Sequence, residues 1–304
     1  TTKPFPALES LVVDLPFNPT LKQRFLVGAV APLGRTLPIP RSIEILSLAR
    51  SAQVAHPSPD LARQLFRNAL HEAILLLTGG WNQLDLSPLS QVSGIWTETA
   101  RPTLFLSMHH GNWEWLAGIL YHLRNDSIGV ARAAHQRPGQ LLLEHVRQYH
   151  KTPVLYNQTG TRVAHRTLRR GGLVAFLADQ RPPTQGEPGT WFGNPTLVTP
   201  LPRLWCQGIT PDIWTGWLLP GPSSYQLTLK RYSPEVISQW DELLDKISFR
   251  SFDAPPSGTS AYSTADLFHV EHRGRTDLCT GDSRIARTIT THSTNAAPTP
   301  PYPE

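Results

Sequence analysis

The chain is poor in cysteine and in charged residues, and it lacks a long hydrophobic run. Its 304 residues include two cysteines, Cys206 and Cys279, too few for a disulfide framework or a zinc ligand set, so a reducing compartment is expected. The charged share of 17% excludes a highly charged coiled coil. The apolar stretch over residues 25–31 is far shorter than the roughly 20 residues of a membrane-spanning helix. We find no basic segment with a small-residue cleavage site and expect no signal peptide.

What the chain does contain is enough apolar sequence for a full hydrophobic core, and an excess of positive charge. Apolar residues make up 39% of the chain, which excludes a wholly disordered protein. The net charge of +5 favours an anionic partner, such as phospholipid headgroups, an acidic carrier protein or nucleic acid. Because the positive charges are scattered rather than gathered in runs, we expect no nucleic-acid partner.

The sequence changes character twice, and we expect three parts. Residues 1–100 are expected to form helices of the main domain that associate with a membrane. One helix begins near Asn18-Pro19 and has a mixed basic and apolar content, which suits a membrane surface or packing within the domain. Another begins at Ser58-Pro59 and is stopped by Gly79-Gly80. Residues 101–250 are expected to form an α/β core. Residues 251–304, rich in Ser, Thr, Ala and Pro, are expected to be a disordered tail.

Short apolar runs alternate with helical segments between residue 102 and about residue 236. The pattern predicts strands at 103–108, 127–131, 153–155, 173–177, 213–219 and 226–229, and helices at 113–123, 140–150 and 162–170. Apolar runs without alternation, separated by helices, are typical of an α/β sheet covered by helices on both faces.

The candidate chemistry lies in the segment Ser107-Met108-His109-His110-Gly111-Asn112-Trp113-Glu114-Trp115. The strand delivers His109 to its carboxyl end, where α/β folds bind their ligands. Gly111 permits a tight turn, and Asn112 is suited to cap the next helix. Glu114 falls in the first helical turn, from which its carboxylate could reach back to the imidazole and raise its basicity. The amides after His109 would offer a helix N-terminus to an oxyanion or phosphate. The same spacing also arises by chance around structural histidines.

Further motifs follow in a fixed order. Arg132 comes after the next predicted strand and Arg147 lies in the following helix. Next come a Gly-Gly-strand block that ends in Asp179-Gln180, an aromatic-Phe-Gly triplet that ends in Gly193, and a Thr-Pro pair at residues 199–200. Together with His-x4-Glu, this series resembles the lysophospholipid acyltransferase superfamily over residues 40 to 235. The branch in question includes the lipid A biosynthesis lauroyl acyltransferases and the mycobacterial phosphatidylinositol mannoside acyltransferase.

The resemblance implies a mixed, mostly parallel sheet flanked by helices, and an O-acyltransferase activity. His109, polarised by Glu114, would deprotonate a hydroxyl of a membrane glycolipid, such as a lipid A precursor or a glycosylated phospholipid. The hydroxyl would attack the thioester of an acyl carrier protein or coenzyme A. Neither a metal nor another cofactor is implied. The implied location is peripheral, on the anionic cytoplasmic face of the bacterial inner membrane. The substrate-binding residues implied are Arg132, Arg147, Asp179, Gln180 and Gly193.

Two departures from the family leave alternatives open. His110 stands where relatives carry an aromatic residue, and the family's C-terminal Trp-x-x-His-Arg-Arg segment is missing. A catalytically impaired paralogue that binds glycolipid without turnover is therefore a second hypothesis. A third is a metal-dependent hydrolase site, formed by His109, His110, His135 and Asp179.

Overall fold

The computed structural model describes residues 7–30, 70–92, 101–133, 137–179, 182, 186–191, 194–221, 223–240 and 242–244. All of these belong to a compact unit that spans Thr1–His272. A second unit, Arg273–Glu304, lies outside the described residues. So do the predicted tail over residues 251–304 and three residues singled out above, His135, Gln180 and Gly193. The boundaries at residues 100 and 250 stay predictions.

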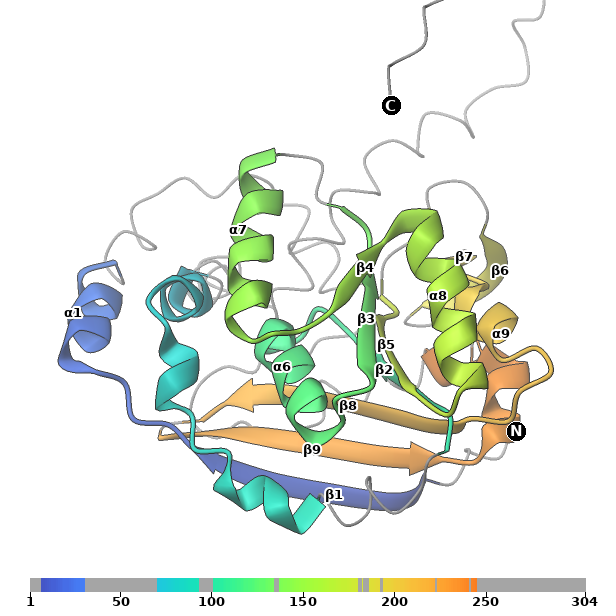
Figure 1. Ribbon diagram of the computed structural model, residues 1–304, viewed down its shortest axis with the longest axis horizontal. Coiled ribbons are helices and arrows are strands. Elements are labelled where there is room, and N and C mark those ends of the chain that lie inside the picture. The colour runs from blue at the N-terminus through green and yellow to red at the C-terminus, as the bar shows by residue number, and fades with distance from the viewer. Residues whose placement is uncertain are drawn as a thin grey trace, which may run out of the picture. The chain divides into compact units, whose positions relative to one another are not determined.

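A mixed sheet organises the described part of the chain. Its seven strands are, in spatial order, β1 (Ala7–Pro16), β9 (Ser224–Tyr232), β8 (Asp212–Pro220), β2 (Thr103–Ser107), β5 (Leu173–Leu177), β3 (Ser127–Ala131) and β4 (Val154–Tyr156) (Figure 1). The strands from β8 to β4 are parallel neighbours, whereas β9 pairs antiparallel with both β8 and β1. The predicted α/β class, with a mostly parallel sheet, is confirmed.

Helices connect the parallel strands, as the alternating pattern predicts. α6 (Trp113–Leu123) connects β2 to β3, α7 (Arg137–Tyr149) connects β3 to β4, and α8 (Asn157–Arg169) connects β4 to β5. The bounds of α6, β3 and β5 coincide with the predicted ones, while α7 and α8 begin earlier than predicted. The chain also forms the hairpin β6 (Glu187–Trp191) and β7 (Asn194–Val198), α9 (Leu201–Trp205), and the 3-10 helices η1 (Gly80–Gln83), η2 (Ser87–Leu89) and η3 (Pro234–Gln239).

Two hydrophobic cores hold the helices against the two faces of the sheet, and β2 contributes to both. Phe105 belongs to the core that contains Trp115 of α6, whereas Leu104 and Leu106 belong to the core that contains Trp205 of α9. Every residue of β2 is buried. A central parallel strand covered on both faces needs apolar residues on both, which explains the run without alternation. The strand that leads to His109 is therefore fixed by packing on both sides.

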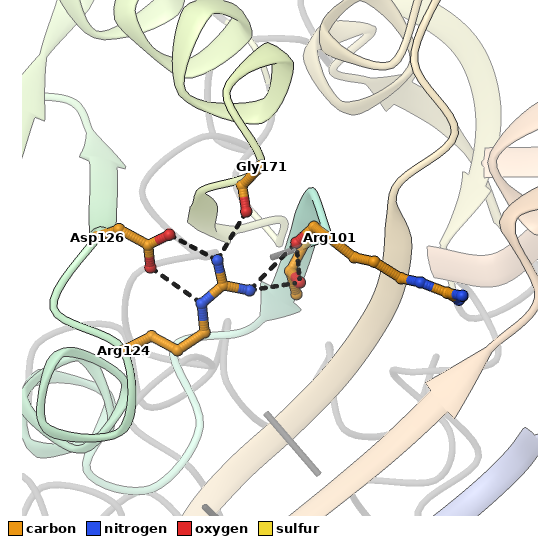
Figure 2. A network of polar contacts seen from close by, with 5 residues as sticks. Arg101, Arg124, Asp126 and Gly171 are labelled. Atoms are coloured by element: carbon orange, nitrogen blue, oxygen red, sulfur yellow. Dashed lines mark hydrogen bonds and ion pairs between the residues drawn. The ribbon is translucent and has the colours of Figure 1, made fainter. Parts of the chain in front are cut away.

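Arg124 ties three strands together at the edge of the sheet where β2, β3 and β5 begin (Figure 2). Its Nε and Nη2 donate to the two carboxylate oxygens of Asp126, at 2.9 and 2.6 Å. Nη2 also donates to the carbonyl of Gly171, and Nη1 donates to the carbonyl of Arg101 and the hydroxyl of Thr103. These contacts match the five N–H donors of a guanidinium. This buried side chain therefore fixes the edge opposite to the carboxyl ends of the strands.

The N-terminal residues contribute an edge strand and a helix, α1 (Leu21–Val30). The helix is capped by Thr20 rather than by Asn18, because the Thr20 hydroxyl accepts from the Gln23 amide and the Gln23 side chain accepts from the Thr20 amide. The second predicted helix is described only over residues 70–77, and it ends as predicted before Gly79, whose φ is 71°. Within the described residues, none of the helices is long and apolar enough to cross a bilayer.

Candidate active site

The loop between β2 and α6 carries the predicted motif, and it is anchored on β8. Gly111 has a φ of 65°, and a Cβ at this position would lie 2.1 Å from the carbonyl oxygen of Leu218. The amide of Asn112 donates to that same carbonyl at 2.8 Å. The side-chain oxygen of Asn112 accepts from the Trp115 amide at 3.0 Å, which confirms the predicted helix cap. Glycine is therefore required at this turn, and asparagine starts the helix.

His109 is bound by Asp179, on the neighbouring strand's extension. Ser107 and Leu177 are partners across the parallel strands β2 and β5, so His109 and Asp179 both lie two residues beyond the carboxyl ends of these strands. One carboxylate oxygen of Asp179 lies 2.7 Å from the ring Nδ1 of His109, and the other accepts from the main-chain N–H of His109 at 2.8 Å. The Asp179 side chain is 1% exposed and that of His109 is 12% exposed.

This contact fixes the tautomer of the neutral imidazole. A carboxylate accepts a hydrogen bond, so in the neutral ring Nδ1 carries the proton and Nε2 is the basic nitrogen. The indole of Trp113 packs edge-on against the ring, with centroids 5.1 Å apart, and limits its rotation. An imidazole held in one tautomer by a buried carboxylate is suited to take a proton from a hydroxyl and to carry the resulting charge.

The carboxylate that binds His109 is therefore not the one expected from the His-x4-Glu spacing. Glu114 is buried, and its two oxygens accept from Nε and Nη2 of Arg147, at 3.0 and 2.7 Å. Nη1 of Arg147 donates to the hydroxyl of Tyr156 at 2.7 Å. Burial lowers the pKa of Arg147, but the hydrogen bonds and negative charge of Glu114 outweigh it, so the net direction is upward. A guanidinium can donate two parallel hydrogen bonds to one carboxylate, which explains why Glu114 pairs with Arg147 of α7 and not with His109.

An apolar pocket lies beside these groups. It has a volume of about 50 Å³ and lies between α6 and the strands β2, β3 and β5. Glu114 and Arg147 form part of its wall, together with Trp113, which also touches the imidazole. Trp113 is thus the residue that links the pocket to the imidazole of His109. Its apolar lining includes Phe105, Leu116, Ala117, Leu120, Val130 and Phe176.

Of the other predicted site residues, the structure describes Arg132 but not Gln180 or Gly193. Arg132 follows Ala131, the partner of Tyr156 across β3 and β4, and so stands at the same edge of the sheet. Tyr156 itself is not predicted from the sequence, although its position at the end of a strand is a signal that it shares with Asp179. The oxyanion or phosphate site expected at the N-terminus of α6 stays a prediction.

The hydrolase hypothesis needs a metal site. Across the residues that the structure describes, no group of three or more His, Cys, Asp or Glu side chains is placed to hold a metal ion. His135, one of the four residues of that hypothesis, lies outside this part of the chain.

A comparison with models of protein families gives a match. Residues 90–209 match the family model of the bacterial lipid A biosynthesis acyltransferases. The matched segment contains both His109 and Asp179, and both members of the Glu114–Arg147 pair. No curated protein matches the chain.

Proposed function

We propose that this chain, whose residues 90–209 match the family model of the bacterial lipid A biosynthesis acyltransferases, is an acyltransferase of that kind. It moves a fatty acyl chain from the thioester of an acyl carrier protein or coenzyme A to a hydroxyl of a membrane glycolipid. The acceptor is a lipid A precursor or a glycosylated phospholipid. The observation that carries the proposal is the imidazole of His109, which is oriented by Asp179 and packs on Trp113, a residue that lines an apolar pocket.

In the proposed reaction, His109 is the general base. Its Nε2 takes the proton of the acceptor hydroxyl while the oxygen attacks the carbonyl carbon of the thioester. Asp179 stabilises the imidazolium that forms. The carbon–sulfur bond then breaks, and the thiolate leaves with the proton from His109. Because an imidazole supplies the base and a thiolate is a good leaving group, the reaction needs no metal or other cofactor, and activity should survive a strong chelator.

We assign the apolar pocket, of about 50 Å³, to a short part of the acyl chain. Glu114 lies at the start of α6 and Leu120 further along it, so the pocket follows the helix away from the edge where His109 stands. Burying methylene groups in such a pocket gains about 0.8 kcal/mol each. Arg132 and Arg147 are the proposed contacts for phosphate or for the charge that develops on the carbonyl oxygen, since a guanidinium stays charged. Glu114 would act through Arg147, whose position it fixes.

The proposed location is peripheral, on the cytoplasmic face of the inner membrane. On α1, Leu21 and Phe25 are one turn apart and are 84% and 72% exposed. Lys22 and Arg24 lie on the same helix and would meet anionic headgroups. Binding of Leu21→Ser/Phe25→Ser to vesicles that contain anionic phospholipid should fall at least tenfold. Wild-type affinity in that variant would refute a role of α1 in membrane binding.

Acyl transfer by the purified chain tests the proposal directly. The chain is incubated with a membrane glycolipid and an acyl thioester of carrier protein or of coenzyme A, and the gain of one acyl chain is followed by mass spectrometry. His109→Ala should lose at least a hundredfold in kcat, because general-base catalysis contributes about 10²–10⁴. The control is His122→Ala, on the exposed end of α6.

Two results would count against the enzyme. Transfer that is unchanged in His109→Ala would remove the general base from the mechanism. Glycolipid binding without transfer by the wild-type chain, with either donor, would favour the impaired paralogue.

A further inference from the structure

A buried carboxylate outside the motif binds the residue that caps α6. Glu72 lies in the helical residues 70–77, and its side chain is 13% exposed. Its Oε2 accepts from the side-chain amide of Asn112 at 2.6 Å. The hydroxyl of Tyr225 on β9 donates to the two oxygens of Glu72, at 3.1 and 3.2 Å. Three segments that are distant in the sequence therefore meet at one carboxylate.

The contact decides how the Asn112 side chain is oriented. An asparagine amide has an acceptor end and a donor end, and either can face a given neighbour. The Trp115 amide needs an acceptor, and Oδ1 of Asn112 supplies it. When ionised, Glu72 offers only acceptors to the opposite end, so the amide nitrogen is held toward Glu72 and the oxygen toward the helix.

Burying this carboxylate is unfavourable in itself. Burial raises the pKa of Glu72 to about 7, and the hydrogen bonds of Tyr225 and Asn112 only partly oppose that shift. A neutral polar or apolar side chain would fill the same space at lower cost. An acid at this position therefore calls for a role, and its shortest contact leads to the active-site loop.

We propose that Glu72 is a positioning residue of the active site, which acts by holding Asn112 so that it caps α6 and fixes the first turn of that helix. The first turn carries Trp113, which packs on His109, and Glu114, which binds Arg147. A shift of the helix start would displace both. This inference rests on the proposed acyl transfer for its catalytic consequence, but the structural link between Glu72 and the helix cap can be tested without it.

A swap of the two side chains tests the link. Asn112→Asp keeps the acceptor for the Trp115 amide but sets two carboxylates against each other. The second carboxylate raises the pKa of Glu72 further, so we expect kcat to fall at least tenfold, with little change in KM, once the pH is high enough to ionise both. Adding Glu72→Gln restores a donor–acceptor pair in reverse, and the double variant should recover to within about threefold of wild type. Glu72→Leu should lose at least tenfold, whereas Tyr225→Phe, which keeps the Asn112 contact, should stay within about twofold.

The exchange rate of the Trp115 amide hydrogen reports on the cap without any turnover. It should rise at least tenfold in Glu72→Leu and in Asn112→Asp, and return toward the wild-type rate in the double variant. A double variant no more active than Asn112→Asp, or an unchanged Trp115 exchange rate in both single variants, would overturn the inference. If the wild-type chain transfers no acyl group, the proposed function fails while the exchange measurement still decides this inference. The swapped variants are nearly isosteric with wild type, so the test stands even if Glu72→Leu does not fold.

Discussion

Asp179 holds His109 at two points, through the ring Nδ1 and through the main-chain N–H. The second contact fixes which carboxylate oxygen faces the backbone and leaves the other for the ring. It arises because β2 and β5 are in register at Ser107 and Leu177, and both chains continue in step for two more residues. The orientation of the imidazole therefore follows from the parallel pairing of two central strands.

Asp179→Asn should abolish most of the activity while leaving the fold intact. The asparagine oxygen would stay on the main-chain N–H of His109, because that group needs an acceptor. Its NH₂ would then face Nδ1 and donate to it, which places the ring proton on Nε2 and removes the base. In a comparable buried Asp–His pair the wrong tautomer costs about 10⁴-fold in kcat. We expect a loss of at least about 10³-fold, measured as kcat for acyl transfer.

The matched control for that variant is Asp212→Asn. Asp212, like Asp179, accepts a hydrogen bond from a side-chain nitrogen, the Nη2 of Arg231 at 2.9 Å, but it lies at the start of β8, away from the carboxyl edge. Its kcat should stay within about twofold of wild type. Equal losses in the two variants would show that Asp179 matters for stability and not for the orientation of His109.

The sequence predicts both members of this pair as residues at strand ends, but not their contact. Local spacing favours Glu114 as the partner of His109, because only five positions separate them. The choice of Asp179 depends on strand order, which places β5 beside β2 although about 70 residues lie between them. No pattern along the chain reveals that order. The ion pair of Arg147 with Glu114 likewise depends on where α7 packs.

The same distinction holds for the fold. Apolar runs predict β2, β3 and β5 well because both faces of these strands are buried. The edge strand β1 is not predicted, since Leu11, Val13 and Leu15 pack inward while Val12 between them is 55% exposed. The hairpin of β6 and β7 is also missed, and it begins with Glu-Pro-Gly, which reads as a turn.

The effects of substituting Glu114 and Arg147 on the free energy of unfolding should depend on each other. Glu114→Gln leaves a buried guanidinium without its charged partner, and Arg147→Met leaves a buried carboxylate, so each should destabilise by about 3 kcal/mol. The double variant has no uncompensated charge and should lose less than the sum, with a coupling of about 1–3 kcal/mol. Urea unfolding measures all four proteins of the cycle.

The exposed pair of Arg203 and Glu187 is the control for this cycle. Both side chains are more than a third exposed, and Glu187→Gln should change the unfolding free energy by less than about 1 kcal/mol. Additive effects of Glu114→Gln and Arg147→Met would mean that the two side chains do not depend on each other. Non-additivity between Glu114→Gln and Asp179→Asn in kcat would instead support the coupling of Glu114 to His109 that the spacing suggests.

Arg124→Lys should destabilise the sheet although the charge is kept. An ammonium has three donors at one point and cannot reach Asp126, Gly171, Arg101 and Thr103 together. At least one of the buried acceptors would lose its partner, so we expect a loss of about 2 kcal/mol in unfolding free energy. Arg169→Lys, on the exposed end of α8, should change it by less than about 0.5 kcal/mol. A change that small in Arg124→Lys would show that the multiple hydrogen bonds of Arg124 add nothing to stability.

Glu72 should make the protein less stable as the pH rises through the range between its two pKa values. Burial raises the pKa of Glu72 to about 7 in the folded protein, from an ordinary value of 4.5. Between these values the folded state holds more protons than the unfolded state, so the unfolding free energy falls with rising pH, by at most about 1.4 kcal/mol per pH unit. Glu72→Gln does not titrate and removes this contribution.

The difference in unfolding free energy, wild type minus Glu72→Gln, should therefore decrease between pH 4.5 and pH 7 and level off above it. Neighbouring groups such as His71, 3.9 Å from Glu72, are present in both proteins, so their own titration largely cancels in the difference. A difference that is constant over this range, or that increases, would show that Glu72 is ionised in the fold with its ordinary pKa or below it.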